Sequence, residues 1–221
     1  MLALMVFVLL FAAAWIATEG PGSGIPASTE TRKKLAETDE FQHDCIIDEK
    51  DWFRDEAKAE SGLKSFYDKT GVQPKVLITS YNPDLQTDEQ KEAWAKQWYQ
   101  TNVGNENTFL YVYFSAADPY TAGYTCHVNG KQVEEVMDPE AVQIFRMYWD
   151  RNYNDKGLDK DDFIIATFDS TADRIMEKTM TVPVVLGFVV AAVGILGIIL
   201  IFVLVANKMQ EDKIKELHKR R

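Results

Sequence analysis

The run Thr108-Phe-Leu-Tyr-Val-Tyr-Phe114 decides the fold of this sequence. A continuous apolar and aromatic run of strand length is typical of a strand that is buried on both faces. We therefore place this run at the centre of a sheet and interpret the neighbouring segments as elements that pack around it.

Strands and helices alternate on both sides of this run. Lys75–Ser80 and Tyr124–Val128 are predicted as further strands, and the second ends in a tight turn at Asn129-Gly130. Apolar spacing and capping signals predict four helices: one that ends at Gly71, one that begins at the capping box Thr87–Gln90, one that begins at Asp138-Pro139, and one over about 161–176. The alternation predicts an α/β fold, an α/β/α sandwich with a central mixed sheet and helices on both faces.

A membrane segment follows this domain. Residues Val182–Ala206 carry no charge and would form a helix of about 37 Å, enough to span a bilayer core of about 30 Å. The tail 207–221 has a basic excess, whereas residues 18–181 are strongly acidic. Because basic flanks stay inside, we expect a cytoplasmic tail and a domain outside the cytoplasm, in the cell membrane.

The composition of residues 1–39 predicts a signal segment followed by a linker. Residues 1–17 are apolar throughout, which fits either a retained signal anchor or a cleaved signal peptide. Residues 18–39 are interpreted as a linker, because their Gly, Pro, Ser and Thr content shows no apolar period. The globular domain is expected over 40–178.

The charge balance excludes one class of function. The chain has 24 Lys and Arg against 34 Asp and Glu, a formal net charge of −10. Such a chain repels phosphate backbones and has no basic stripe, so we expect no nucleic-acid partner.

Several local stretches resemble the extracytoplasmic TPM-domain family. They are Lys69–Pro74, Asn105–Leu110, Val128–Lys131, Val136–Ala141 and Asp169–Met176, and the last two are similar to membrane-anchored relatives from anaerobic Gram-positive bacteria. The resemblance covers residues 40–178 and implies the α/β fold. Some plant members are linked to acid phosphatase activity and photosystem repair, and some bind divalent metal, so the resemblance implies a phosphatase or hydrolase as an alternative function.

Two aspartates are the candidates for catalysis. Asp169 and Asp173 lie four residues apart and follow an apolar run, as a phosphatase nucleophile would. A haloacid-dehalogenase-type site needs a second Asp two positions after the first, where this chain has Thr171. The alternative is an exposed helical face near Arg174.

An acidic loop is the candidate for metal. Oxygen ligands in a flexible loop suit Ca²⁺, and the loop near Gly157 offers five carboxylates, Asp150, Asp155, Asp159, Asp161 and Asp162. No register gives the EF-hand pattern, so a weak Ca²⁺ site and a solvated loop that caps the next helix both stay open.

The two cysteines, Cys45 and Cys126, offer a disulfide, because cysteines on the oxidising side of a membrane tend to pair. Zinc is disfavoured, because Cys126 and His127 point to opposite faces of a strand.

The aromatic side chains are interpreted as core, with an exposed partner-binding face as the alternative: Trp94, Trp98, Tyr111, Tyr113, Tyr148 and Trp149. No Ser-His-Asp, Walker, Rossmann or HExxH pattern is present. We therefore expect a membrane-tethered extracytoplasmic interaction module, acting with another envelope protein in envelope assembly or maintenance, and keep the phosphatase as the alternative.

Overall fold

The computed structural model describes residues 24–36, 40–118, 120–177 and 182–219. The chain divides into two compact units, Gly22–Thr179 and a second unit formed by Met1–Pro21 with Met180–Arg221. The predicted signal anchor or signal peptide at 1–17 lies outside the described residues.

A four-stranded mixed sheet forms the centre of the first unit. The strands are β1 (Ile46–Asp48), β2 (Gln73–Thr79), β3 (Thr108–Phe114) and β4 (Tyr124–Asn129), in the spatial order β1-β2-β3-β4. β1, β2 and β3 are parallel, and β4 is antiparallel to β3, with Tyr111 opposite His127. The predicted strands are confirmed, and the apolar run 108–114 is β3 itself; the short strand β1 is an addition.

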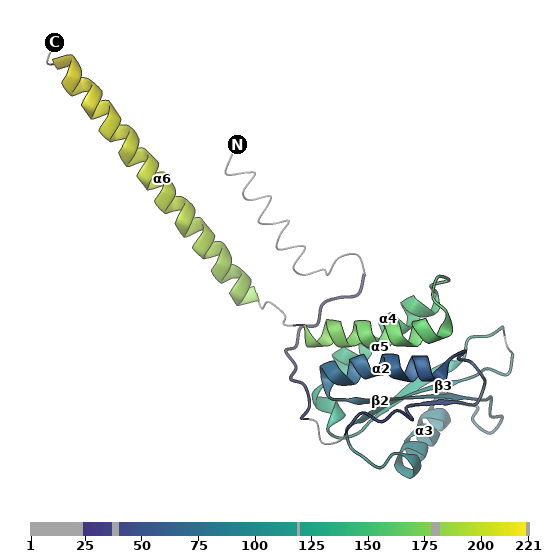
Figure 1. Cartoon of the computed structure of the whole chain (residues 1–221). Coiled ribbons are helices and arrows are strands. Elements are labelled where there is room, and N and C mark those ends of the chain that lie inside the picture. Colours follow the sequence, from purple (N-terminus) through teal and green to yellow (C-terminus); the bar gives the residue numbers. More distant parts are fainter. Residues whose placement is uncertain (1–23, 37–39, 119, 178–181, 220–221) are drawn as a thin grey trace. The chain divides into compact units, whose positions relative to one another are not determined.

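Helices cover both faces of the sheet, as predicted. The helices α2 (Glu56–Thr70), α4 (Pro139–Tyr153) and α5 (Lys160–Met176) lie on one face, and α3 (Asp88–Asn102) lies on the other (Figure 1). Alternate residues of β3 serve the two layers: Tyr111 joins the larger core below α4 and α5, while Val112 joins the smaller core below α3. The α/β/α sandwich is therefore confirmed.

Local signals in the sequence define the helix ends. The capping box is present, because Thr87 accepts a hydrogen bond from the Gln90 amide and the Gln90 side chain accepts one from the Thr87 amide. Asp138 caps α4 immediately before Pro139. Gly71 follows α2 with φ of 72°, a left-handed conformation that glycine adopts without strain.

The segment 24–36 belongs to the folded unit rather than to a linker. Ile25 lies in the larger core, and the Leu35 amide donates to the Thr70 carbonyl at 2.9 Å. Arg32 is buried and binds the carboxylates of Asp138 and Glu140. Composition alone therefore misassigns this segment, because the partners of Arg32 lie more than a hundred positions away.

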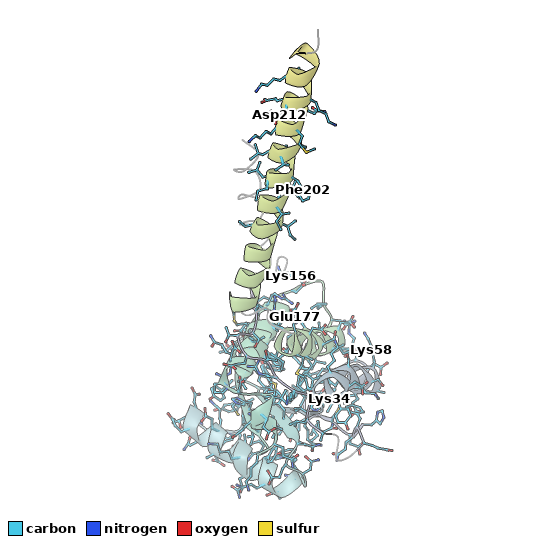
Figure 2. The ribbon with its side chains drawn as sticks, turned by 90° about the vertical axis from the view of Figure 1, so that its left-hand side faces the viewer. Lys34, Lys58, Lys156, Glu177, Phe202 and Asp212 are labelled. Atoms are coloured by element: carbon cyan, nitrogen blue, oxygen red, sulfur yellow. The ribbon has the colours of Figure 1, made fainter. Side chains whose placement is uncertain are left out.

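The second unit contains the helix α6 (Val182–Lys219). Within the described residues, its segment Val193–Lys215 is long and apolar enough to cross a membrane. Large apolar side chains of this segment are exposed, and Phe202 and Asp212 both project from the ribbon (Figure 2). Such a surface is stable in lipid and costly in water, so this helix suits membrane anchoring.

Candidate functional site

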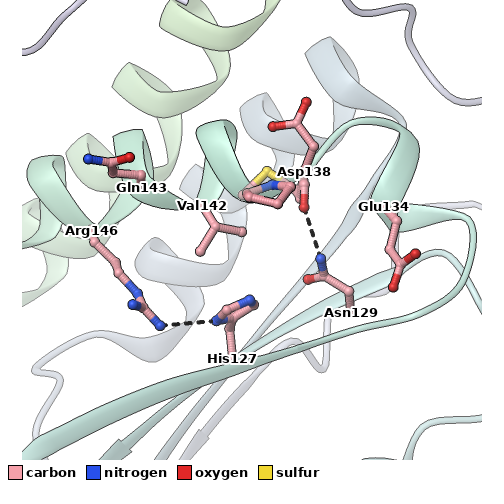
Figure 3. A pocket seen from close by; sticks show the side chains of 9 residues that line it. His127, Asn129, Glu134, Asp138, Val142, Gln143 and Arg146 are labelled. Carbon is pink, nitrogen blue, oxygen red and sulfur yellow. Dashed lines mark hydrogen bonds between the residues drawn. The ribbon is translucent and has the colours of Figure 1, made fainter.

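A polar hollow lies between the edge strand β4 and helix α4. It has a volume of about 870 Å³ and is lined by residues of β4, of the following turn and of α4. Figure 3 shows His127 and Asn129 rising from β4 toward Val142, Gln143 and Arg146 of α4. Because no strand of the described residues pairs with the outer side of β4, the hollow opens along the edge of the described sheet.

The sheet geometry directs His127 and Asn129 into this hollow. Successive side chains of a strand point to opposite faces, so residues 127 and 129 share one face and Cys126 and Val128 share the other. Cys126 accordingly packs in the core on the α3 side, while His127 contacts the ring of Phe109 on the α4 side.

His127 is electrically neutral at physiological pH. Burial, and secondarily the charge of Arg146, lower the pKa of His127 to about 4. Nη2 of Arg146 lies 3.5 Å from Nδ1 of His127. Since the guanidinium can only donate, Nδ1 accepts and Nε2 carries the ring proton. His127 therefore offers the hollow a hydrogen-bond donor.

Arg146 has an uncompensated charge. It is exposed on α4, and among the described residues no carboxylate lies within ion-pair distance of its guanidinium. Several other cations of this acidic domain are paired, as Lys69 is with Asp169 and Asp173. Arg146 therefore leaves several N–H donors free for an anionic group from outside the chain.

Acceptors lie at the opposite end of the hollow. The Asn129 amide nitrogen donates to the Met137 carbonyl at 2.9 Å, while its buried Oδ1 has no hydrogen-bond partner (Figure 3). Glu134 is exposed and pairs with no described cation. The hollow thus has donors at its Arg146 end and acceptors at its Asn129 end.

The carboxyl ends of the parallel strands, where α/β folds commonly bind ligands, are already occupied by structural contacts. Asp48 accepts hydrogen bonds from the backbone amides of Lys50, Trp52 and Phe53. Glu49 binds the Thr79 hydroxyl and the Ser80 amide. A hollow of about 360 Å³ nearby contains Lys91, which is paired with Asp88 and lies over the Tyr124 ring.

The predicted catalytic aspartates form a structural ion pair with Lys69. Its Nζ lies 2.7 Å from Asp169 and 2.6 Å from Asp173. Burial alone would raise the pKa of Asp169, but hydrogen bonds from Lys69 and Ser65 outweigh it and lower the pKa. Both donors bind Oδ1 of Asp169 and hold this carboxylate in an ion pair, and the described residues do not pair it with a general base, so this geometry does not favour a phosphatase.

Four of the five predicted calcium ligands have separate partners. Asp155 accepts from the Gly157 amide, Asp159 caps α5, and Asp161 accepts from the Arg54 amide. Asp162 pairs with Lys58, and the backbone carbonyl of Asp150 accepts a hydrogen bond from the Asn154 side chain. Across the described ranges, no three His, Cys, Asp or Glu side chains form a group that could hold a metal ion.

The predicted disulfide between Cys45 and Cys126 is wrong. Both cysteines are free and buried. Cys45 precedes β1 and packs on the α2 side, whereas Cys126 lies in β4 and packs on the α3 side. They are separated by three strand spacings, roughly 14 Å, and lie on opposite faces, so no disulfide can join them.

The aromatic residues behave as core. Tyr111, Tyr148 and Trp149 are buried, and Tyr113, Trp94 and Trp98 are partly buried against the two cores. Trp52 stacks on Tyr113 at 5.7 Å between ring centroids. An exposed aromatic face is therefore not formed by this set.

Sequence reasoning missed the hollow, because no motif joins His127 to Arg146. A signal was nevertheless present. His127 and Asn129 share one face of a strand whose other face carries Cys126 and Val128, and polar side chains on a face that a helix should cover need an explanation.

No protein-family model matches this sequence, and neither does any curated protein sequence. Among solved structures, the chain is similar to the solution NMR structure of the N-terminal domain of the cg2496 protein from Corynebacterium glutamicum. The two are 18% identical, the match covers 64% of this chain and 86% of that chain, and the TM-score is 0.37. A likeness at this level carries no argument about function.

Proposed function

We propose that this protein is a membrane-tethered interaction module whose α/β domain lies outside the cytoplasm and binds envelope proteins during their assembly or maintenance. The observation that carries the proposal is the hollow between β4 and α4, which combines an unpaired Arg146 with a buried, unpartnered Asn129 Oδ1. Unsatisfied buried polar atoms are costly, so their retention favours a ligand that satisfies them.

The hollow suits binding rather than catalysis. The imidazole of His127 is neutral and accepts from Arg146, and no Ser, Thr or Cys hydroxyl or thiol lines the hollow beside it. A nucleophile next to a base is the usual sign of covalent catalysis, and the lining residues lack that pair. The resemblance to the TPM-domain family is consistent with this proposal, because the shared stretches are structural.

The membrane tether and its orientation rest on α6 and the tail. The segment Val193–Lys215 is apolar enough to cross a membrane, and the basic excess of the tail 207–221 favours a cytoplasmic tail. Protease added to intact cells without a wall should therefore digest the α/β domain and spare an epitope after Arg221. Loss of the tail epitope before the domain would contradict this orientation.

Site-specific photo-crosslinking tests the binding surface. A benzoylphenylalanine at Gln143, exposed on the rim of the hollow, should give discrete adducts in membranes of cells that express the full chain. The same group at Gln97, exposed on α3 across the sheet, serves as the matched control and should give none. Equal adduct patterns at the two positions, or none at Gln143, would contradict the proposed surface.

A further inference from the structure

The hollow between β4 and α4 has a polarity that specifies its ligand. Donors from Arg146 and His127 lie at one end, and the acceptors Asn129 Oδ1 and Glu134 lie at the other (Figure 3). A simple anion would satisfy the donors and leave the acceptors unpaired. A simple amine would do the reverse. The complementary ligand therefore carries a carboxylate at one end and N–H groups at the other.

The length of the hollow indicates whether its ligand is a single amino acid or a peptide. His127 and Asn129 are two positions apart on a strand, which is about 7 Å. Arg146 lies eight positions after the Asp138 cap of α4, which is about 12 Å along the helix axis. A single amino acid cannot reach both ends, whereas an extended chain of about three residues at 3.3–3.6 Å each can.

The free edge of β4 supplies the remaining recognition. The sheet order places β4 at the edge, and no backbone hydrogen bond on its outer side is made by any other described segment. Such an edge accepts an added strand through main-chain hydrogen bonds. With its carboxylate beside His127 and its preceding residues beside Asn129, an added peptide would run antiparallel to β4.

We propose that this hollow binds the carboxyl-terminal segment of an extended peptide, about three residues long, with its terminal carboxylate on Arg146 and the Nε2–H of His127. An N–H of the peptide donates to Asn129 Oδ1, and a free amino terminus on a short peptide lies near Glu134. This inference rests on the proposed interaction function and names the chemistry of the partner.

Ligand-observed NMR with short peptides tests this assignment on the full chain in lipid nanodiscs. Trialanine with free termini should bind with a Kd of roughly 0.1–1 mM, as expected for a small polar ligand. Trialanine amide should bind at least tenfold more weakly, because its carboxylate is neutralised. Alanine itself should show no saturable binding, because it is too short to span the hollow.

Two variants that each remove one positive charge distinguish binding at this site from a general electrostatic attraction to the domain. Arg146→Gln removes the proposed carboxylate partner from an exposed helical position and should weaken trialanine binding at least tenfold. Lys156→Gln removes a positive charge from the exposed turn between α4 and α5 and should leave binding unchanged. Circular dichroism of both variants should match the parent chain.

The outcomes distinguish the two proposals. Equal binding of trialanine and its amide, or unchanged binding by Arg146→Gln, would overturn the peptide carboxylate as the ligand. If crosslinking at Gln143 still gave discrete adducts, the interaction function would stand with a different ligand class. If crosslinking also failed, both proposals would fall together.

Discussion

Arg32 lies 2.6 Å from the carboxylate of Asp138, although the two residues are 106 positions apart in the sequence. The same guanidinium binds Glu140 at 2.8 Å and is almost completely buried, with 2% of its side chain exposed. Asp138 also caps α4 and lines the hollow. Arg32 therefore connects the N-terminal segment of the domain to the helix that carries Arg146.

Removing Arg32 should destabilise the domain. Arg32→Met leaves the carboxylates of Asp138 and Glu140 without their cation, and losing one member of a buried pair costs about 3–5 kcal/mol. Because these carboxylates are 27% and 29% exposed, water solvates them in part, and we expect a loss of about 2–3 kcal/mol in the free energy of unfolding. Urea unfolding followed by tryptophan fluorescence in detergent measures it.

The neighbouring Lys33 is the matched control for this change. It is exposed, so Lys33→Met should alter the unfolding free energy by less than about 0.5 kcal/mol.

The dependence of the unfolding free energy on acidic pH is a second measurement of the Arg32 contacts. Burial alone would raise the pKa of Glu140, but hydrogen bonds from Arg32, Thr29 and Ser28 lower it to about 2. The stability from this group is present above pH 4.5 and is lost toward pH 2, and Arg32→Met should flatten that loss.

The turn after β4 should tolerate no side chain at Gly130. A Cβ there would lie 2.3 Å from the Glu106 carbonyl oxygen, a backbone atom that cannot move without shifting the turn. We expect Gly130→Ala to cost about 1–3 kcal/mol and to displace Asn129 beside it. Gly104→Ala, where a Cβ meets nothing within 4 Å, is the control and should unfold like the parent chain. Equal unfolding midpoints for the two variants would argue against this packing.

How far the sequence predicts this molecule depends on the range of the interaction. The run 108–114 is buried on both faces and therefore needs no partner to be recognised, and the capping box of Thr87 and Gln90 is complete within four residues. β1 was missed because Ile46–Asp48 is too short to show a period. Segment 24–36 was misassigned because its polar composition conceals Arg32, whose partners lie on α4.

The candidate site was missed for the same physical reason. His127 and Arg146 are 19 positions apart, and no sequence motif joins them. The aspartates that the sequence did single out lie on α5 within reach of Lys69 on α2, a contact that the spacing of residues cannot reveal. Tertiary packing therefore decides which polar groups are free to bind a ligand.

The aspartate pair should not support phosphatase activity. Asp169→Asn combined with Asp173→Asn removes both partners of Lys69, and we expect no change in the hydrolysis of aryl phosphates by the full chain. Because Asp169 and Asp173 are 39% and 63% exposed, the loss of stability should stay within about 1 kcal/mol. Turnover that the wild type shows and the double variant lacks would restore the phosphatase hypothesis.

The cysteines should remain free thiols. Burial, as the largest cause, raises the pKa of both Cys45 and Cys126 to about 12, so little reactive thiolate forms at neutral pH. Iodoacetamide should modify both residues in denaturant without reductant and neither in the folded protein. Intact mass spectrometry measures the two products. An unmodified chain two hydrogen masses lighter would reveal a disulfide that this fold cannot form.

The protonation of His127 should lower the free energy of unfolding in a defined pH range. The pKa of His127 is about 4 in the folded chain, against 6.5 for an ordinary histidine, because burial and then the charge of Arg146 oppose the proton; Lys96 also opposes it and Glu92 favours it. The unfolded chain therefore binds more protons between these values. The stability from neutral His127 is complete above pH 6.5 and is lost as the pH falls toward 4.

The size and the pH window of this effect separate it from the other acidic groups. A shift of this magnitude corresponds to roughly 3 kcal/mol, whereas the contribution of Glu140 changes only below pH 4.5. His127→Gln should remove the slope between pH 6.5 and 4.5, and Arg146→Gln should raise the His127 pKa while leaving it below 6.5, since burial is the larger cause. Urea unfolding at pH 7.0, 5.5 and 4.5, with the imidazole titration followed by NMR, measures both. If His127 titrated near 6.5 in the parent chain, its ring would be charged at mildly acidic pH and could not accept from Arg146, and the donor end of the hollow would need a different description.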